Sequence, residues 1–265
     1  MEIIKTDLKN LHQALGWENP WRGNAPGEGV PFRNWKMEDH DAPILKYLYQ
    51  NVQPRRHLEF GTWYGFGACL VAESSPATIW TLNLWEGEKR ETGENLYGHV
   101  EVELQDANPK SQIVTTPSGL LSFWRKRTRL DRTPVSRIFK ASDSGELIGR
   151  LYRERGFGNR VNQVFCDSLE WDTAAYPDSF FDTIMIDGGH GEGIVQSDTI
   201  KSLRLLRPGG IMIWHDYCPD AEIVRDFPTS KGVVDAIHNM SGVLGDYFDS
   251  LHWIFPSYIL VGCKK

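Results

Sequence analysis

The sequence predicts an α/β fold in which a largely parallel sheet carries helices on both faces. Short runs of β-branched and aromatic residues alternate along the chain with segments of helical periodicity, as a doubly wound sheet requires. A glycine-rich turn follows the first predicted strand and leads into a helix, the connection at which such sheets bind ligands. With 265 residues, of which 40% are hydrophobic, the chain can supply the core of one such domain.

The N-terminal elements are predicted from periodicity and composition. Residues 1–17 are expected to form a helix with Leu8, Leu11 and Leu15 on one face. Residues 18–39 are rich in Gly, Pro and Trp and predict an irregular segment. A helix over 41–52 follows, so we expect residues 1–54 to form an N-terminal helical cover.

Seven strands are predicted in the remainder of the chain, and they lie at 56–60, 79–84, 161–166, 181–187, 211–215, 251–255 and 258–263. The last two form a closing antiparallel hairpin. Helices are expected at 68–72, 194–206 and 232–240. The second of these ends at Arg207-Pro208-Gly209-Gly210, because proline cannot continue a helix and glycine accepts the left-handed cap. A long insertion, at about 86–158, separates the second and third strands.

Charge and composition exclude several kinds of partner. A net charge of −6 argues against nucleic acid as a general partner. No apolar run is long enough to span a bilayer, which argues against a membrane protein. The four cysteines are scattered without CxxC spacing, as is typical of reduced thiols in a cytoplasmic protein. A small-molecule partner is therefore expected, and the oligomeric state, including a homo-oligomer, stays open.

The most informative stretch follows the strand at 56–60. Glu59 precedes a turn that contains Gly61, Gly65 and Gly67. Glycines permit positive φ and a close approach of a ligand to the backbone, and the next helix presents free N–H groups to the turn. The glycine order differs from the G-x-G-x-x-G of dinucleotide sites. A nucleotide-like ligand is therefore predicted, and a turn that only packs a helix against a strand is the simpler alternative.

The pattern E-x-G-x-x-x-G-x-G resembles motif I of class I S-adenosylmethionine (SAM)-dependent methyltransferases. The resemblance implies a Rossmann-like, seven-stranded, mostly parallel sheet whose seventh strand runs antiparallel between the fifth and the sixth. It also implies that 55–265 form a SAM-binding domain. In it, Glu59, Gly61, Thr62 and Gly65 would hold the amino-acid end of the cofactor. An ammonium group there suits Glu59, whereas a pyrophosphate would be repelled.

Residues at the ends of the second and third strands are further cofactor candidates. Where the family usually has an acid for the ribose hydroxyls, this chain has Asn83, with Glu86 three residues later, and either could hold the ribose. Asp167 and Ser168 match the acid and small polar residue that meet the adenine amino group in the family. The alternative for this pair is a helix N-cap.

Two further motifs follow the fourth and fifth strands, Ile186-Asp187-Gly188-Gly189-His190 and Trp214-His215-Asp216-Tyr217. Together they resemble a subgroup of small-molecule O-methyltransferases, sugar enzymes among them, that carry an I-D-G-x-H motif and an acidic pair after strand five. Methyl transfer to an alcohol requires removal of the hydroxyl proton, for which histidine is suited. We therefore predict His190 as the general base, with Asp187 as a second catalytic residue that would also contact the cofactor.

A divalent cation is also implied by this resemblance, with Asp187, His215 and Asp216 as ligands. Neighbouring strands lie about 4.8 Å apart, so both carboxylates can reach one ion. Mg²⁺ prefers such oxygens and would activate and orient the hydroxyl. His215 stands where an acid is usual, however, and a nitrogen ligand suits Mn²⁺, Fe²⁺ or Zn²⁺ better.

The sequence thus predicts a SAM-dependent O-methyltransferase that acts on a hydroxylated small molecule, such as a sugar or a glycosylated natural product. A SAM-binding regulatory or assembly protein is the alternative, although it would need no general base and no acidic pair. The insertion is expected to select the substrate, and its basic run at 125–132 is either a solvated helix face or a lid for a phosphate or carboxylate. Asp198 is predicted to face solvent or to pair with Lys201.

Overall fold

The structure is a computed structural model that describes residues 1–84, 137–140 and 148–265, with side chains described outside 137–140. Most of the predicted insertion, including Glu86 and the basic run at 125–132, lies outside the described residues. In the part of the chain that is described, no helix has the length and apolar character needed to cross a membrane.

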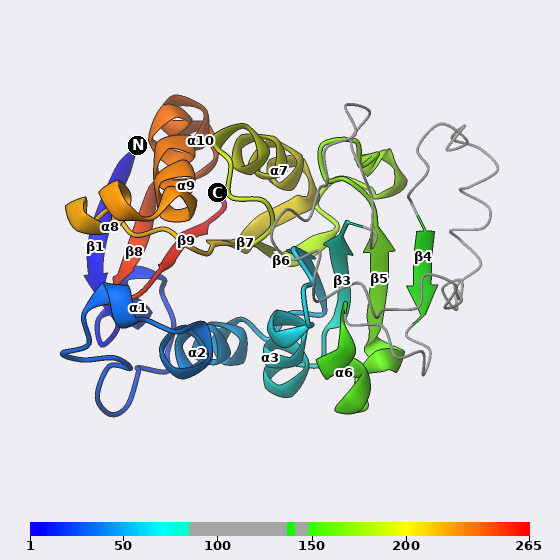
Figure 1. Cartoon of the computed structure of the whole chain (residues 1–265), viewed down its shortest axis with the longest axis horizontal. Coiled ribbons are helices and arrows are strands. Elements are labelled where there is room, and N and C mark those ends of the chain that lie inside the picture. Colours follow the sequence, from blue (N-terminus) through cyan, green and yellow to red (C-terminus); the bar gives the residue numbers. More distant parts are fainter. Residues whose placement is uncertain (85–136, 141–147) are drawn as a thin grey trace.

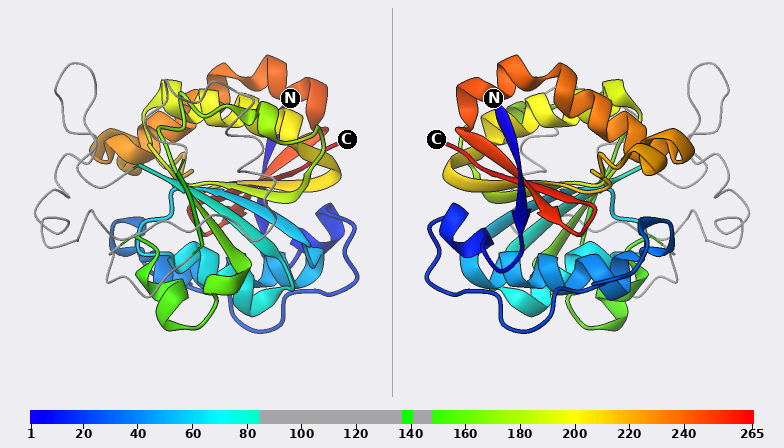
Figure 2. Two further views of the ribbon diagram at one scale, coloured as in Figure 1. Left: turned by 90° about the vertical axis from the view of Figure 1, so that its right-hand side faces the viewer. Right: turned by 90° about the vertical axis from the view of Figure 1, so that its left-hand side faces the viewer.

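A single twisted sheet crosses the middle of the molecule (Figures 1 and 2). Among the described residues it has nine strands, in the spatial order β1 (Glu2–Asp7), β8 (Ser250–Phe255), β9 (Ile259–Cys263), β7 (Leu206–Trp214), β6 (Phe181–Ile186), β2 (Arg56–Phe60), β3 (Thr78–Asn83), β5 (Val161–Phe165) and β4 (Arg137–Lys140). β9 runs antiparallel between β7 and β8. The predicted position of the closing hairpin is therefore confirmed.

Helices cover both faces of this sheet (Figure 1). One layer holds α1 (Leu11–Ala14), α2 (Ala42–Val52), α3 (Phe66–Ser74) and α6 (Arg150–Glu154). The other holds α7 (Glu192–Leu205), α9 (Pro228–Asn239) and α10 (Ser241–Tyr247), with α8 (Ala221–Asp226) leading into α9. Short 3₁₀ turns lie at Phe32–Asn34, Gly158–Arg160 and Thr173–Ala175, and a π-helical turn, η2, spans Met37–Asp41. The doubly wound arrangement is as predicted.

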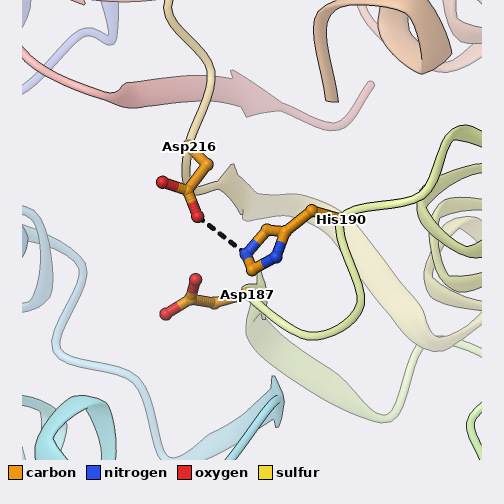
Figure 3. Close-up of side chains that lie close together, drawn as sticks. All are labelled: Asp187, His190 and Asp216. Carbon is orange, nitrogen blue, oxygen red and sulfur yellow. Dashed lines mark ion pairs between the residues drawn. The ribbon is translucent and has the colours of Figure 1, made fainter. Parts of the chain in front are cut away.

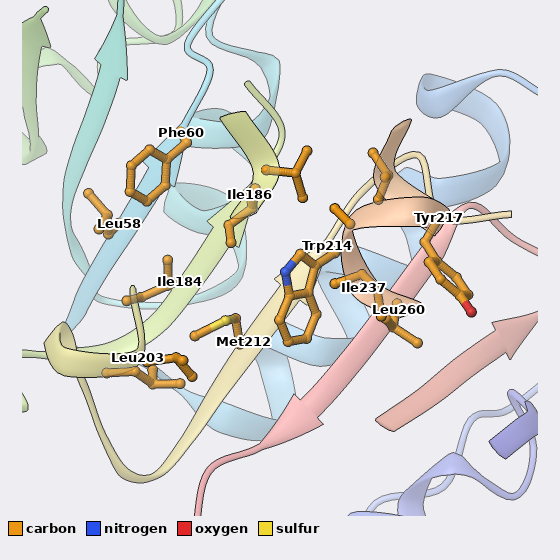
Figure 4. Close-up of a cluster of buried hydrophobic side chains, with 14 of the residues drawn as sticks. Leu58, Phe60, Ile184, Ile186, Leu203, Met212, Trp214, Tyr217, Ile237 and Leu260 are labelled. Carbon is orange, nitrogen blue, oxygen red and sulfur yellow. The ribbon is translucent and has the colours of Figure 1, made fainter. Parts of the chain in front are cut away.

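Each face of the sheet has its own apolar core. On β6, Ile184 and Ile186 contribute to the core beneath α7 and α9, whereas Met185 between them contributes to the core beneath α2 and α3. Figure 4 shows part of the first core, in which Trp214 and Met212 of β7 lie near Ile184 and Ile186. A strand buried on both faces has no polar alternation, which explains the continuous apolar runs in the sequence.

The predicted helix over 1–17 is wrong. Residues Glu2–Asp7 form β1, which pairs in parallel with β8, and only Leu11–Ala14 are helical. The edge of β8 offers this segment a row of backbone partners, and such a tertiary contact outweighs a weak local helix preference. Two of the three leucines of the predicted apolar face, Leu8 and Leu11, are nevertheless buried.

The four residues Arg207–Pro208–Gly209–Gly210 do not form a separate loop after the helix. α7 ends at Leu205, and these residues already belong to β7, which begins at Leu206. Gly209 has the expected positive φ of +69°. The strand is irregular there, because its pairing with β6 shifts register between Phe181 and Thr183.

The expectation that Asp198 faces solvent is also wrong. Its side chain is fully buried on α7, with 0% exposure, and burial raises the pKa of its carboxyl to about 7. Lys201 does not form a salt bridge with it and instead donates to the carbonyl oxygens of Ser168 and Leu169. α7 packs against both the sheet and α9, so more of its surface is covered than a single apolar stripe predicts.

Candidate active site

The glycine-rich turn after β2 is built against the end of β6. Gly61 has a φ of +93°, and a Cβ atom there would lie 2.0 Å from the carbonyl oxygen of Asp187. Gly65 has a φ of +86° and caps α3. A Cβ atom at Gly67 would lie 1.8 Å from Oε1 of Glu59. At each of the three positions a side chain would clash or would strain a left-handed backbone, so glycine is required. The turn is thereby held next to the peptide of Asp187.

Beneath the turn, a chain of buried hydrogen bonds ends at the carboxylate of Glu59. The Tyr152 hydroxyl donates to Oε1 of Gln163 (3.0 Å), and the Gln163 amide donates to the Thr62 hydroxyl (2.7 Å). The Thr62 and Thr81 hydroxyls are 2.7 Å apart, and Thr81 donates to Oε2 of Glu59 over 2.7 Å. Each member between Tyr152 and Glu59 both donates and accepts, so the chain has one direction and links Glu59 to the turn.

Glu59 itself is 1% exposed, and burial raises its pKa to about 8, opposed by the hydrogen bond from Thr81. A carboxyl whose pKa is higher in the folded state stabilises the fold below its unfolded pKa and loses that contribution as pH rises toward 8. An ammonium group of a bound cofactor would offset this cost. The position is therefore unfavourable for stability and suited to a cationic ligand.

Replacing Glu59 with glutamine should raise the melting temperature of the free protein at pH 8 relative to the parent, with little difference at pH 4. The same variant should bind S-adenosylhomocysteine (SAH) about 10- to 100-fold more weakly, as expected when a charge-assisted hydrogen bond is lost. Thermal unfolding across this pH range and calorimetry measure both effects. Glu73→Gln is the matched control, because Lys46 and Arg155 pair with Glu73 and lower its pKa, so this variant should lose stability at neutral pH. Equal SAH affinity of parent and Glu59→Gln would contradict the proposed contact.

Asn83, at the end of β3, holds the same turn from the side. Its side-chain oxygen accepts hydrogen bonds from the backbone N–H groups of Thr62 and Trp63, each over 3.0 Å. Its Nδ2 donates to the carbonyl of Leu84 over 3.0 Å. Asn83 thus has a structural role that the sequence did not indicate, and its part in ribose binding stays a prediction.

Asp167 and Ser168 lie in the turn after β5. Oδ1 of Asp167 accepts the N–H of Leu169 over 2.9 Å, and the N–H of Cys166 bonds to the carbonyl of Asn83 over 2.9 Å. The loop therefore lies beside Asn83 at the end of β3, and its contact with adenine stays a prediction. Asp167 thus caps a turn. The alternative considered for it, a helix N-cap, is not found, because residues 168–170 form a turn.

A second cluster lies at the carboxyl ends of β6 and β7, where Asp187, His190 and Asp216 point toward one another (Figure 3). Nε2 of His190 lies 2.7 Å from Oδ2 of Asp216. Nδ1 of His215 lies 3.1 Å from Oδ1 of Asp187 and 3.4 Å from Oδ2 of Asp216. The four side chains that the sequence predicts for base and metal are thus brought together.

Local backbone features hold this cluster in place. Asp216 has a φ of +60°, a conformation that non-glycine residues rarely adopt and that costs roughly 1–3 kcal/mol. The following N–H, of Tyr217, bonds to the carbonyl of Tyr258 over 3.1 Å. On the other side, Gly232 of α9 packs so closely that a Cβ atom would lie 2.1 Å from the carbonyl oxygen of His190. The loop that carries His190 is therefore fixed by α9.

Charges in the cluster alter its proton affinities. Burial lowers the pKa of His215, but Asp187 and Asp216 outweigh it and hold that pKa well above the ordinary value. Burial also lowers the pKa of His190, and the close, negatively charged carboxylate of Asp216 reverses the direction and raises it. The pKa of Asp216 is correspondingly well below its usual range despite burial, because both histidines face it. The cluster favours positive charge between its carboxylates.

The donor atoms also fit a divalent cation. One ligand atom from each of Asp187, His190 and Asp216 can lie within 4.8 Å of the others. Nε2 of His190 and Nδ1 of His215 are buried and make no well-oriented hydrogen bond, although carboxylate oxygens are near both. Both ring nitrogens therefore face the carboxylates, as the ligands of a shared cation would. The sequence assigned the nitrogen ligand to His215, and the geometry adds His190 as a second candidate.

Asp41 is a member of this site that sequence reasoning missed. It is 1% exposed, and its Oδ2 lies 3.2 Å from Nε2 of His215. Its Oδ1 accepts the N–H of Tyr258 over 3.2 Å. An acid just before a helix is usually an N-cap, but no side-chain cap bond is made to α2. Only the tertiary contact reveals its place.

Comparison with known proteins identifies the family. A family model of a methyltransferase domain matches residues 58–217, which include the glycine-rich turn and the cluster at Asp187 and Asp216. The chain belongs to this methyltransferase family. The match ends at Tyr217, so the closing hairpin and the N-terminal cover, with Asp41, lie outside it.

A solved structure shows the same fold at low sequence identity. A putative caffeoyl-CoA O-methyltransferase from Staphylococcus aureus is 13% identical, with 97% of this chain and 90% of that one covered at a TM-score of 0.52. An O-methyltransferase from Bacillus cereus in complex with SAH is 16% identical, with the same coverage of 97% and 90% and a TM-score of 0.49. No curated protein matches the chain at a significant level.

Proposed function

We propose that this methyltransferase transfers the methyl group of SAM to a hydroxyl of a small molecule, such as a sugar or a glycosylated natural product, with the help of a divalent cation. The observation that supports this most is the contact between the two clusters. A Cβ atom at Gly61 would lie 2.0 Å from the carbonyl oxygen of Asp187, so the cofactor turn directly adjoins the acid–base cluster. A regulatory SAM-binding protein would have no use for that adjacency.

The cofactor would lie across the carboxyl ends of β2, β3 and β5. Its amino-acid end would meet Glu59 and the turn at Gly61, Thr62 and Gly65. The ribose would meet Asn83 or Glu86, and the adenine would meet the Asp167–Ser168 turn. The family match supports SAM as the cofactor, and the burial of Glu59 supports a cationic group at one end.

The reaction requires a base for the acceptor hydroxyl, and we assign that role to His190. Its side chain is 34% exposed, so a substrate can reach it, while Asp216 at 2.7 Å stabilises the protonated ring. The oxygen attacks the methyl carbon, the bonding pair returns to sulfur, and the hydroxyl proton passes to His190. The products are a methyl ether and neutral SAH.

Asp187 and Asp216 would hold the cation, with a histidine nitrogen as a further ligand. When bound, a divalent cation lowers the pKa of a coordinated hydroxyl and orients it. The chain contributes the carboxylates that fix the ion and the glycine turn that fixes the methyl donor. Both groups end at the same edge of the sheet.

SAH formation from SAM, measured with a panel of free and glycosylated hydroxyl acceptors, tests this proposal. We expect turnover with at least one sugar-bearing acceptor, and we expect EDTA or Asp187→Asn to lower it by about 100-fold or more, since several kcal/mol of charge stabilisation would be lost. Asp187→Asn should weaken cofactor binding far less than turnover, because Glu59 and the glycine-rich turn also hold the cofactor. Full turnover both in EDTA and in the variant would discard the cation.

A further inference from the structure

Among the residues that the structure describes, Asp41 is the one buried carboxylate of this cluster that comes from outside the strand ends. It closes the π-helical turn η2 and precedes α2, in the N-terminal segment that the family match does not include. Its two oxygens have different partners, the N–H of Tyr258 for Oδ1 and Nε2 of His215 for Oδ2, each at 3.2 Å. Because Tyr258 also accepts the N–H of Tyr217, its backbone joins Asp41 to the loop that carries Asp216.

The ring of His215 lies between Asp41 and the predicted cation ligands. Nε2 faces Asp41, while Nδ1 lies 3.1 Å from Asp187 and 3.4 Å from Asp216. Nδ1 is buried and makes no well-oriented hydrogen bond. If Nε2–H is donated to Asp41, a cation that displaces the Nδ1 proton would meet the lone pair of Nδ1 between the two carboxylates. A carboxylate that fixes a histidine in this way is a recurrent partner of metal-binding histidines.

We propose that Asp41 is the positioning residue of the cation site, which holds His215 so that Nδ1 binds the cation beside Asp187 and Asp216. This inference rests on the proposed cation-assisted function. An acid at position 215 would place its negative charge directly on the ion. In this chain that charge lies on Asp41, and the imidazole ring of His215 separates it from the ion. The site therefore selects a cation that accepts nitrogen, such as Mn²⁺, Fe²⁺ or Zn²⁺, in preference to Mg²⁺.

Titration of the full-length protein with Mn²⁺ tests the role of Asp41. Asp41→Asn keeps an oxygen for the N–H of Tyr258 but removes the charge facing His215, and it should weaken Mn²⁺ binding about 10- to 100-fold, as loss of such a partner typically does. His215→Glu should shift the preference toward Mg²⁺. In the His215→Glu background, Asp41→Asn should have little further effect, because the two residues act as one unit. SAH affinity, measured in parallel, should stay near the parent value in all three proteins.

A spectroscopic measurement identifies the ligand directly. Pulsed electron paramagnetic resonance of bound Mn²⁺ should show nitrogen coupling in the parent and in His190→Ala, and none in the double variant His190→Ala/His215→Glu. This arm uses no Asp41 variant, so it decides about His215 even where Asp41→Asn fails to fold. Absence of nitrogen coupling in His190→Ala would overturn the inference.

The remaining outcomes separate the inference from the proposed function. An unchanged Mn²⁺ affinity in Asp41→Asn, or an equal loss in the His215→Glu background, would overturn the role of Asp41 and leave the methyltransferase proposal intact. A parent protein that binds SAH but no Mn²⁺ would overturn both the inference and the cation. A parent protein that binds Mn²⁺ but not SAH would contradict the proposed function. The comparison of Mn²⁺ affinity between the parent and Asp41→Asn would still test the role of Asp41.

Discussion

Replacing His190 with alanine should lower kcat by about 10²- to 10⁴-fold, the usual contribution of a general base. The affinity for SAH should stay near the parent value, because no contact of His190 reaches the glycine-rich turn. The loss follows from the position of the ring, 2.7 Å from Asp216 and one third exposed, where no other side chain of the cluster is as accessible. Steady-state turnover and SAH calorimetry measure the two quantities separately.

A matched control is available in His12, which lies on α1 and outside the cluster. His12→Ala should keep the parent kcat. Because the pKa of His190 is raised by Asp216, the parent activity should increase with pH as the ring loses its proton, and His190→Ala should lack that increase. A His190→Ala variant with parental turnover and an unaltered pH profile would remove His190 from the mechanism.

Replacing Gly61 with alanine should destabilise the protein by about 2–5 kcal/mol and abolish SAH binding, because a left-handed φ and a close backbone contact both oppose the new methyl group. The φ is +93°, and the methyl group would lie 2.0 Å from a carbonyl oxygen that cannot move without shifting β6. Denaturant unfolding gives the stability change, and calorimetry gives the binding.

Gly16→Ala separates steric overlap from backbone strain. Gly16 has a φ of +68° but nothing within 4 Å of the added atom. Gly16→Ala should therefore lower the free energy of unfolding only by the conformational penalty, about 1–2 kcal/mol, and leave SAH binding intact. If the two variants were equally stable and both bound SAH, the packing of the glycine-rich turn on Asp187 would not be a requirement of the site.

The fold could be predicted where local patterns carry the information. The strands of the central sheet are apolar runs between turn residues, and the glycine turn marks the first crossover, so β2, β3, β5 and β6 were found to within one residue at their ends. The start of β7 was placed five residues late, because Arg207–Gly210 were expected to end the preceding helix. β1 was not found, because Ile3 and Ile4 acquire their strand partners from β8, at the far end of the sequence. β4 was missed for the same reason, since it forms only by pairing with β5.

The sequence predicts only those site residues that lie within contiguous motifs. Asp187 and His190 share one motif and Asp216 lies in another, so their convergence follows from strand order. Asp41 is 174 positions from His215, and no spacing in the sequence connects them. The buried chain from Tyr152 to Glu59 likewise joins residues of several elements, and each member alone resembles an ordinary polar residue.

Calorimetric titration of the parent protein with SAH, with Mn²⁺ and again with EDTA, tests the central claim most directly. SAM-dependent methyl transfer at the turn after β2 predicts binding in the micromolar range to one site in both conditions, weakened in Glu59→Gln and absent in Gly61→Ala. A parent protein that binds no SAH in either condition would contradict the assignment of the glycine-rich turn as the cofactor site.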